Sequence, residues 1–432
     1  MRINEWKERL LLGQLDDELE TLYGTEPALA RTRYLSLLDA FKARYGDADT
    51  VILSAPGRTE LAGNHTDHQN GNVLCAAVTM DTLAVVSPRA DSLVRIHSQG
   101  FGDIVLQLDA LDARAEEAGT SEAIVRGIAA NFRRRGYRVG GLDAVVTSNV
   151  PAGGGLSSSA AFEILLAAAF SHLYNSDALP PLTLAIIGQA AERDYFGKPC
   201  GLLDQAASAC GGITRIDFAD PASPAVERLR FDFRDSGYVL CAVDTRTSHA
   251  DLTDDYAAIP AEMRSVATFF GRTVLREVDS EVFFNAKENG SLSSVLPARS
   301  ILRAEHFFEE NARVDVMAEA LRRGDIAQYM ELMNASGRSS REKLQNVIPS
   351  LHPEMRSMAE ALDRAGALLQ GKGAWRIHGG GFAGCIQCLV PTADFPAFRS
   401  AMDGYYGNGA CREMRIRPCG PSILGASSKK GD

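Results

Sequence analysis

Residues 151–160 read PAGGGLSSSA, and they separate two segments with different patterns. The run before them, residues 142–148 (LDAVVTS), predicts a strand, and the apolar run after them predicts a long helix. Successive glycines let backbone N–H groups approach a polyanion, and the helix directs its N-terminal dipole toward the same point. A turn with a serine N-cap is the simpler interpretation, but three glycines and three serines exceed what capping requires. The stretch therefore predicts a phosphate-binding loop, although not a Walker A loop, because GK[ST] is missing.

A second polar segment, residues 55–71, reads APGRTELAGNHTDHQNG and follows a predicted strand. We expect it to form a loop that gathers Arg58, Asn64, His65 and Asp67. Carboxylate, amide and imidazole groups supply the paired donors and acceptors that sugar hydroxyls need, and Arg58 can neutralise a phosphate or a carboxylate. On the residues alone, a solvated turn fits equally well.

A third segment, residues 191–205, reads AERDYFGKPCGLLDQ. Asp204 stands in apolar company, where a carboxylate is costly unless a cation such as Arg58 pairs with it. Such a pair would make Asp204 a positioned base. Glu192, on the preceding predicted helix, could approach a Mg²⁺ ion held by the serines of residues 157–159. For each acid taken singly, a surface salt bridge is the competing interpretation.

The remaining patterns describe strands and helices in both halves of the chain. Residues 1–45 predict two amphipathic helices, and residues 256–345 are mostly helical in pattern. The predicted strands read VILSAP, NVLCAAV, LAVVSP, LVRIHS, ITRIDF, RLRFDF, YVLCAVD and the two arms of WRIHGGGFAGCIQCLV. These patterns predict an α+β protein with mixed β-sheets and helices in two lobes, residues 1–215 and 216–432.

The composition is that of an ordinary globular protein, with 432 residues, 45% of them hydrophobic and 23% charged. The 45 Lys and Arg against 55 Asp and Glu leave a net charge of −10, which argues against a nucleic-acid partner. No uncharged apolar run approaches the roughly 18 residues of a spanning helix, so we expect no membrane partner. We expect a cytoplasmic protein, because the N-terminus lacks a signal-like apolar segment. Cys385 and Cys388 are expected on a strand, facing opposite ways, which makes metal binding there the weaker interpretation.

Taken together and in order, these motifs resemble the GHMP kinase family, and most closely its galactokinase branch. The segments that carry the resemblance are APGRTELAGNHTDH, PAGGGLSSSA, AERDYFGKPCGLLDQ, VDTRTSHADLTDDY, RAEHFFEEN and HGGGFAGC. The resemblance implies a two-lobed fold with the active site between the lobes, and ATP and Mg²⁺ as cofactors. The implied reaction is phosphorylation of the anomeric (C1) hydroxyl of galactose, which gives galactose 1-phosphate and ADP. The oligomeric state stays open, with a monomer favoured.

The resemblance also implies roles for individual residues. Asp204 and Arg58 would form the catalytic pair, with Asp204 accepting or orienting the proton of the anomeric hydroxyl. The implied sugar pocket consists of Arg58, Asn64, His65, Asp67, Gly201, Asp204 and Tyr256. The implied ATP-binding residues are Gly153, Gly154, Gly155, Leu156, Ser157, Ser158, Ser159, Gly379, Gly380 and Gly381. The implied Mg²⁺ ligands are Ser159, or its neighbour Ser158, and Glu192.

Two residues depart from the family pattern, because Asn64 stands where galactokinases usually have Glu and His68 where they usually have Tyr. The Glu of the family resembles a hook for the C6 hydroxyl of the sugar. An amide can still bond a hydroxyl, but it removes a charge that would repel a C6 carboxylate. Residues 67–69 (DHQ) also resemble plant galacturonate kinases. His68 has a structural interpretation as well.

Three alternative functions therefore accompany the galactose kinase. The first is a kinase for a C6-modified galactose such as galacturonate. The second is a catalytically silent sugar-sensing homologue, which is disfavoured because Ser157, Ser158, Ser159, Glu192 and Asp204 are all present. The third is another family member, such as a mevalonate kinase, which the polyol-reading GNHTDH segment disfavours.

Overall fold

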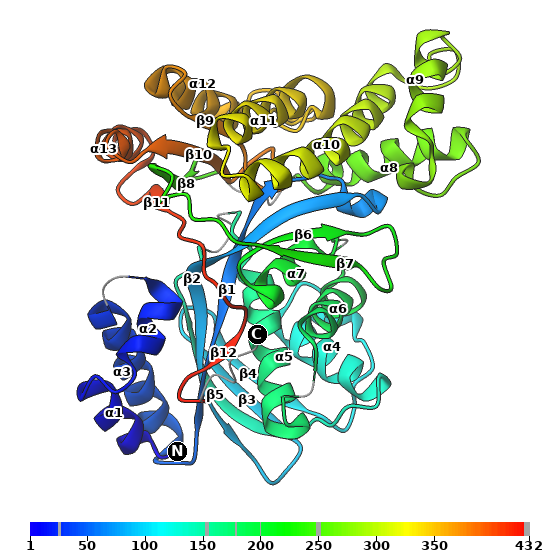
Figure 1. Ribbon diagram of the computed structural model, residues 1–432. Helices are drawn as coiled ribbons and strands as arrows, with labels where there is room; N and C mark the ends of the chain where they lie inside the picture. The colour runs from blue at the N-terminus through cyan, green and yellow to red at the C-terminus, as the bar shows by residue number, and fades with distance from the viewer. Residues whose placement is uncertain (25–26, 152–154, 178, 199, 248–251, 427–432) are drawn as a thin grey trace.

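The computed structural model describes residues 1–24, 27–151, 155–177, 179–198, 200–247 and 252–426, and Figure 1 shows the arrangement of its helices and strands. The strands are β1 (Val51–Ala62), β2 (Asn72–Pro88), β3 (Leu93–Ser98), β4 (Gly102–Gln107), β5 (Leu142–Ser148), β6 (Ile213–Asp217), β7 (Ala225–Leu229), β8 (Tyr238–Asp244), β9 (Ala374–Ile377), β10 (Cys385–Pro391), β11 (Cys411–Glu413) and β12 (Ser422–Ile423). The α-helices are α1 (Ile3–Leu11), α2 (Asp16–Tyr23), α3 (Pro27–Tyr45), α4 (Ser121–Arg134), α5 (Ser158–Asn175), α6 (Pro181–Ala191), α7 (Leu203–Cys210), α8 (Thr253–Phe269), α9 (Ser280–Glu288), α10 (Ala298–Arg322), α11 (Ile326–Ser339), α12 (Ser357–Leu369) and α13 (Phe395–Tyr406). Shorter helical segments are η1 (Asp67–Gln69), η2 (Ala115–Glu117), η3 (Glu192–Phe196), η4 (Leu275–Glu277) and η5 (Ser340–Leu344).

The larger sheet has eight strands and is covered on both faces. Its order is β12-β1-β2-β5-β3-β4, and β6 and β7 extend from β2. Helices α1 to α3 lie beside one face and α4 to α7 beside the other (Figure 1). Because successive side chains of a strand point to opposite faces, Ile52 packs with the N-terminal helices and Leu53 packs with the second group. Strand β1 is therefore buried almost throughout.

The smaller sheet is antiparallel and has four strands in the order β11-β8-β10-β9. Strand β10 alternates between two cores in the same way, since Leu389 packs in the core that includes α10 and α11, whereas Val390 packs in the core that includes α12 and α13. Cys385 and Cys388 lie on this strand and pack in different cores. The strand prediction for these two cysteines is confirmed.

The segment that contains Arg58 is a strand rather than the loop that its sequence predicts. Strand β1 continues through Pro56 and Gly57 to Ala62, and its pairing with β2 shifts register between Pro56 and Arg58 and again between Glu60 and Ala62. Such bulges let a strand absorb residues that are typical of turns. Arg58 is therefore held by a sheet, while the loop proper begins after Ala62.

Three further predictions about elements are corrected. The N-terminal segment has three helices rather than two, because Gly13, with φ at 72°, ends the first and Pro27 begins the third. NVLCAAV and LAVVSP form the single strand β2, in which the buried Asp81 accepts hydrogen bonds from Ser54 and Tyr23 and so needs no turn at the surface. RLRFDF contributes only its first two residues to β7.

The α+β class with helices against both sheets is confirmed. The division at residues 215 and 216 stays a prediction. Strand β12, near the C-terminus, returns to the larger sheet beside β1, so the first and last strands are neighbours. Of the helices in the described ranges, none is both long and apolar enough to cross a membrane.

Candidate active site

The centre of the site is a two-pronged ion pair between strand β1 and helix α7. Arg58 Nε donates to Asp204 Oδ1 at 2.6 Å, and Arg58 Nη2 donates to Asp204 Oδ2 at 2.8 Å. The Arg58 side chain is only 7% exposed, whereas that of Asp204 is 31% exposed. A bidentate pair fixes both groups in orientation as well as in distance. The predicted pairing is present, and Asp204 is more exposed to solvent than Arg58.

The phosphate loop is joined directly to this pair. Ser157, in the left-handed region with φ at 54°, donates from Oγ to Asp204, and the carbonyl of Gly155 accepts a hydrogen bond from Arg58. The backbone N–H of Arg58 donates to the carbonyl of Leu156 at 3.3 Å. Helix α5 begins at Ser158, so its positive end lies at this junction. Gly153 and Gly154 lie outside the described residues.

The pair keeps both of its charges at neutral pH. Burial acts to raise the pKa of Asp204, but the charge and hydrogen bonds of Arg58, helped by Ser157, lower it below its ordinary value. Burial acts against the charge of Arg58 too, yet Asp204 raises the pKa of the guanidinium. The site thus presents an ionised, weakly basic carboxylate beside a permanent cation.

Asp67 and Gly201 lie against each other next to the pair. A Cβ atom on Gly201 would lie 1.6 Å from Asp67 Oδ2, so any side chain at position 201 would displace the carboxylate. Burial, and then the charge of Asp204, raise the pKa of Asp67 to about 7. Asp67 therefore changes charge near neutral pH.

The two histidines of the GNHTDH segment contact each other. His65 Nδ1 lies 3.2 Å from His68 Nε2, and His65 Nε2 lies 2.9 Å from the carbonyl oxygen of Gly380. Burial lowers the pKa of His65 to about 4 and that of His68 well below its ordinary value. Both imidazoles are neutral at pH 7 and offer hydrogen bonds without charge.

Asn64 is fully buried, and its side chain hydrogen-bonds to four other residues. Its Nδ2 donates to Glu60 Oε1 at 3.0 Å and to the carbonyl of Gly379 at 2.6 Å. Its Oδ1 accepts from Asn346 Nδ2 at 2.9 Å and from Ser340 Oγ at 3.4 Å. A sugar contact by Asn64 stays a prediction, and it would require one of these bonds to be exchanged.

The HGGGFAGC motif (residues 378–385) packs against Asn64 and His65. The carbonyl of Gly379 accepts from Asn64, that of Gly380 lies within bonding distance of His65, and that of Gly381 accepts from the hydroxyl of Tyr256 at 2.5 Å. On the other side, a Cβ on Gly379 would lie 3.7 Å from the carbonyl oxygen of Gly155. The motif therefore lies between the segment of Asn64 and His65 and Gly155 of the predicted phosphate loop.

Ser159 and Glu192 approach each other at the far side of the phosphate loop. Ser159 Oγ lies 3.4 Å from Glu192 Oε1, which also accepts from Lys198 Nζ at 3.0 Å. A hydroxyl and a carboxylate are the oxygen donors that Mg²⁺ prefers, and Mg²⁺ commonly binds through one or two protein oxygens together with substrate phosphates. The donor set fits that ion, and the described residues contain no cluster of three His, Cys, Asp or Glu that could hold a metal by itself.

Sequence reasoning missed several polar residues that position the site. His378 is 1% exposed and lies 2.9 Å from Thr59 Oγ1 through Nε2, while its Nδ1 would lie 3.2 Å from a Cβ on Gly155. Glu60 and Arg376 form a buried ion pair, and Glu310 accepts hydrogen bonds from Ser336 Oγ and the backbone N–H of Gly63. The sequence signal was that His378, Glu60 and Glu310 lie within segments that carry the family resemblance.

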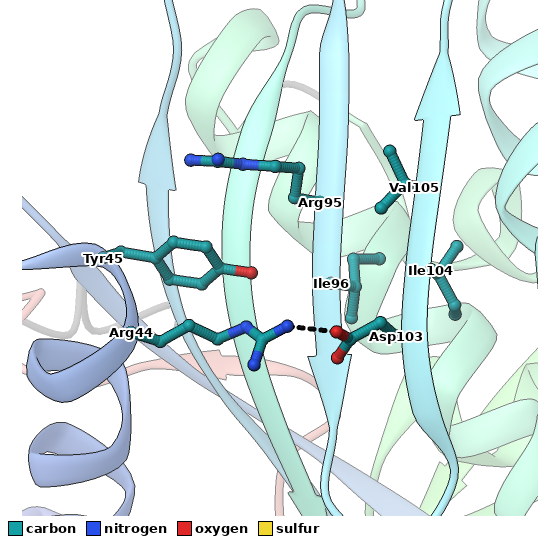
Figure 2. Close-up of a pocket in the computed structure, with 7 residues that line it drawn as sticks. All are labelled: Arg44, Tyr45, Arg95, Ile96, Asp103, Ile104 and Val105. Carbon is teal, nitrogen blue, oxygen red and sulfur yellow. Dashed lines mark hydrogen bonds and ion pairs between the residues drawn. The ribbon is translucent and has the colours of Figure 1, made fainter.

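A separate cavity of about 280 Å³ lies at the surface between α3, β3 and β4. Figure 2 shows its lining, in which Arg44 bonds to Asp103 and the side chains of Tyr45 and Arg95 lie close by. None of its lining residues belongs to the sequence motifs described above. The cavity is therefore not part of the candidate active site.

Comparisons with known proteins agree with this geometry. Three family models match the chain: the galactokinase galactose-binding signature at residues 39–88, the GHMP kinase N-terminal domain at residues 123–212 and the GHMP kinase C-terminal domain at residues 317–408. The first model spans Arg58 to His68, and the second spans the phosphate loop, Glu192 and Asp204.

Among solved structures, the galactokinase of Lactococcus lactis complexed with galactose is 25% identical, with a TM-score of 0.76 over 89% of this chain and 98% of that one. A D-glycero-D-manno-heptose 1-phosphate kinase from Bacteroides thetaiotaomicron is 16% identical, with a TM-score of 0.59 over 86% of this chain and 98% of that one. The mevalonate kinase of Methanococcus jannaschii is also 16% identical, with a TM-score of 0.58 over 85% and 98% of the two chains. The last two likenesses concern the fold alone. With the GHMP kinase fold, both GHMP domain models and the galactose-binding signature in place, the chain belongs to the GHMP kinase family as a galactokinase-like sugar kinase.

Proposed function

We propose that this protein transfers the γ-phosphoryl group of ATP to the anomeric (C1) hydroxyl of galactose, giving galactose 1-phosphate and ADP. The observation that carries the proposal is the bidentate Arg58–Asp204 pair, whose half-open carboxylate is also bonded to Ser157 of the phosphate loop. An acceptor hydroxyl beside Asp204 would thus lie next to the phosphates of a nucleotide.

Asp204 orients the sugar hydroxyl rather than removing its proton early. Its lowered pKa makes the carboxylate a weak base. Phosphoryl transfer proceeds through a loose transition state that asks for little prior activation of the attacking oxygen and much positioning. The proton passes to Asp204 only as the new O–P bond forms. Arg58 holds the carboxylate and stabilises the negative charge on the transferring group.

The nucleotide phosphates bind at the start of α5, with Gly153, Gly154, Gly155, Leu156, Ser157, Ser158 and Ser159 from one side and Gly379, Gly380 and Gly381 from the other. Backbone N–H groups at a helix N-terminus favour an anion. Ser159 and Glu192 hold the Mg²⁺ that accompanies ATP, and this ion offsets charge on the phosphates.

The sugar binds through Asp67, His65, Tyr256 and the space beside Gly201. Ionised Asp67 accepts hydrogen bonds from sugar hydroxyls, and the neutral His65 imidazole can donate or accept. Asn64 supports this pocket from beneath through its bond to Gly379. We place the reaction in the cytoplasm, where ATP is available, since the eight cysteines are free thiols, as a reducing compartment favours.

The second candidate substrate is a C6-oxidised galactose such as galacturonate. The residue that favours it is Asn64, whose amide puts no negative charge beneath the pocket. Two observations weigh against it, because His65 and His68 are neutral and because Arg58 is already bonded twice to Asp204. A substrate carboxylate would gain no free cation from these three residues, so galactose ranks first.

The test is ADP release by the purified protein with ATP and Mg²⁺, with D-galactose, D-galacturonate, N-acetylgalactosamine and D-glucose offered in parallel. We expect the largest kcat/KM for galactose, with Asn64→Glu retaining that preference. A preference for galacturonate that Asn64→Glu abolishes would establish the second candidate. Sugar binding without ADP release from any sugar would instead identify a silent sensor.

A further inference from the structure

Three buried polar side chains from three helical segments meet behind the proposed cation site. Gln205, on α7, donates from Nε2 to Glu163 Oε2 at 2.9 Å and to Glu192 Oε2 at 2.8 Å. Glu163 and Gln205 are fully buried, and Glu192 is 2% exposed. One amide group therefore ties a carboxyl group of α5 to the carboxylate at the start of η3.

A glycine on the neighbouring helix lets these groups pack closely. Gly188 of α6 faces the contact, and a Cβ there would lie 3.2 Å from Glu163 Oε2 and 3.3 Å from Gln205 Cγ. Gln205 directly follows Asp204, so one turn of α7 carries both the partner of Arg58 and the bond to Glu192. A shift of this turn would move the two ends of the site together.

A count of donors and acceptors shows what the cluster lacks. Both hydrogens of the Gln205 amide are used, and Gln205 Oε1 and Glu163 Oε1 are buried without a hydrogen-bond partner. Two acceptors on residues already bonded to each other need a donor, and a proton on Glu163 is the one that the residues themselves can provide. A carboxylic acid pairs with an amide through two such bonds, one in each direction.

The charges nearby agree with this assignment. Burial, and then the charge of Glu192, raise the pKa of Glu163 well above its ordinary value, against the hydrogen bond from Gln205 and the charge of Lys198. Glu192, in contrast, has Lys198 Nζ at 3.0 Å and the hydroxyl of Ser159 at 3.4 Å. Glu192 thus accepts hydrogen bonds from Lys198, Ser159 and Gln205. Glu163 accepts from Gln205.

We propose that Glu163 and Gln205 form a positioning pair that fixes the orientation of the Glu192 carboxylate toward the cation of the nucleotide. The pair touches neither sugar nor phosphate, and it acts only through Glu192. The inference rests on the proposed function, because that function assigns the cation to Ser159 and Glu192.

The experiment measures the affinity of Mn²⁺ for the protein in the presence of ADP, by electron paramagnetic resonance of free Mn²⁺, so no turnover is needed. Gln205→Met keeps the size of the side chain but removes the amide, and we expect it to weaken Mn²⁺ binding about 10- to 100-fold, as loss of an outer-shell partner does. Glu163→Met is expected to act in the same direction. Glu163→Gln keeps a neutral partner for the amide and should bind Mn²⁺ within about twofold of the wild type.

Two controls separate positioning from general damage. Gln189→Met removes a different amide, one on α6 that donates to the carbonyl of Cys200 at 3.3 Å, and should leave Mn²⁺ affinity unchanged. Galactose binding without nucleotide, measured by calorimetry, should be unchanged in every variant. If Gln205→Met fails to fold, Glu163→Gln still tests the inference, since a tenfold or larger loss of Mn²⁺ affinity in that variant, which keeps a hydrogen-bond partner for the amide, would overturn the pair.

The outcomes also distinguish this inference from the proposed function. Mn²⁺ affinity that depends on Gln205, in a protein that phosphorylates no sugar, would support the positioning pair and contradict the proposed reaction. Normal galactose phosphorylation with wild-type Mn²⁺ affinity in both Met variants would remove the pair and leave the reaction. Absence of Mn²⁺ binding by the wild type would overturn the pair.

Discussion

Strand β1 carries two Arg–carboxylate pairs that begin two residues apart, Arg58 with Asp204 and Glu60 with Arg376. The first leaves the Asp204 side chain 31% exposed, whereas Arg376 is 0% and Glu60 7% exposed. The pKa of Asp204 is lowered, while burial raises the pKa of Glu60 despite its cation. The same two functional groups therefore form a partly exposed pair, to which we assign the proposed reaction, and a buried link between the two sheets. Exposure of the acid makes the difference.

We expect the largest effect from removing Asp204, the exposed acid. Asp204→Asn keeps the shape of the side chain but loses the carboxylate, and we expect kcat to fall about 10²- to 10⁴-fold, the usual contribution of a positioned proton acceptor. Galactose affinity, measured by calorimetry, should change little. A variant with near-normal kcat and an intact fold would remove Asp204 from the chemistry.

The buried pair should respond in stability instead. Arg376→Met leaves Glu60 without its cation in a closed site, and we expect a loss of about 3–5 kcal/mol in the free energy of unfolding. Arg58→Met leaves Asp204 partly exposed to water, and it should lose less stability but most of the activity. Urea denaturation of both variants checks this, and equal losses would contradict the distinction between the two pairs.

Gly201→Ala tests the close contact between Gly201 and Asp67. The added Cβ would lie 1.6 Å from Asp67 Oδ2, so the carboxylate must move. We expect kcat/KM for galactose to fall by an amount equivalent to about 1–3 kcal/mol, the usual cost of overpacking. Gly404→Ala, where a Cβ would meet nothing within 4 Å, is the matched control and should behave as the wild type.

The smallest expected effect is a pH dependence set by Asp67. Its pKa of about 7 is raised, so the carboxylate that accepts sugar hydroxyls forms only as pH rises through that value. We expect kcat/KM for galactose to rise between about pH 6 and 8 and then level off. The effect on stability has the opposite sign. Because the pKa of Asp67 is higher in the folded than in the unfolded protein, Asp67 stabilises the fold fully below its unfolded-state pKa, and this contribution is lost as pH rises toward 7. Asp67→Asn should flatten the activity profile, and an unaltered profile would exclude Asp67 as its source.

The parts of the site that sequence predicts are local in the chain. The phosphate loop joins glycines to a helix start, and this signal needs no knowledge of distant residues. The galactose-binding signature was recognisable for the same reason, since it is contiguous. Asp204 and Arg58 are an exception, because they lie 146 positions apart. Their pairing could be predicted because an acid among leucines and alanines needs a cation, and the motif at residues 55–71 offered one.

The parts that sequence does not predict depend on contacts across the fold. Glu60 and Arg376 are 316 positions apart, and nothing near either residue announces the other. The burial of Asn64 depends on Gly379 and Asn346 from the other end of the chain. Arg58 was expected on a loop because Pro56 and Gly57 are typical of turns, whereas pairing with β2 across a bulge keeps the strand intact.

The most direct test of the central claim is the position of the transferred phosphate. Wild-type protein incubated with ATP, Mg²⁺ and uniformly ¹³C-labelled galactose is followed by ¹³C and ³¹P nuclear magnetic resonance. We expect one product, in which phosphorus couples to C1, and no such product from Asp204→Asn in the time that the wild type needs for completion. Phosphate on C6, or equal product from Asp204→Asn, would contradict the assignment of the Arg58–Asp204 pair as the catalytic centre.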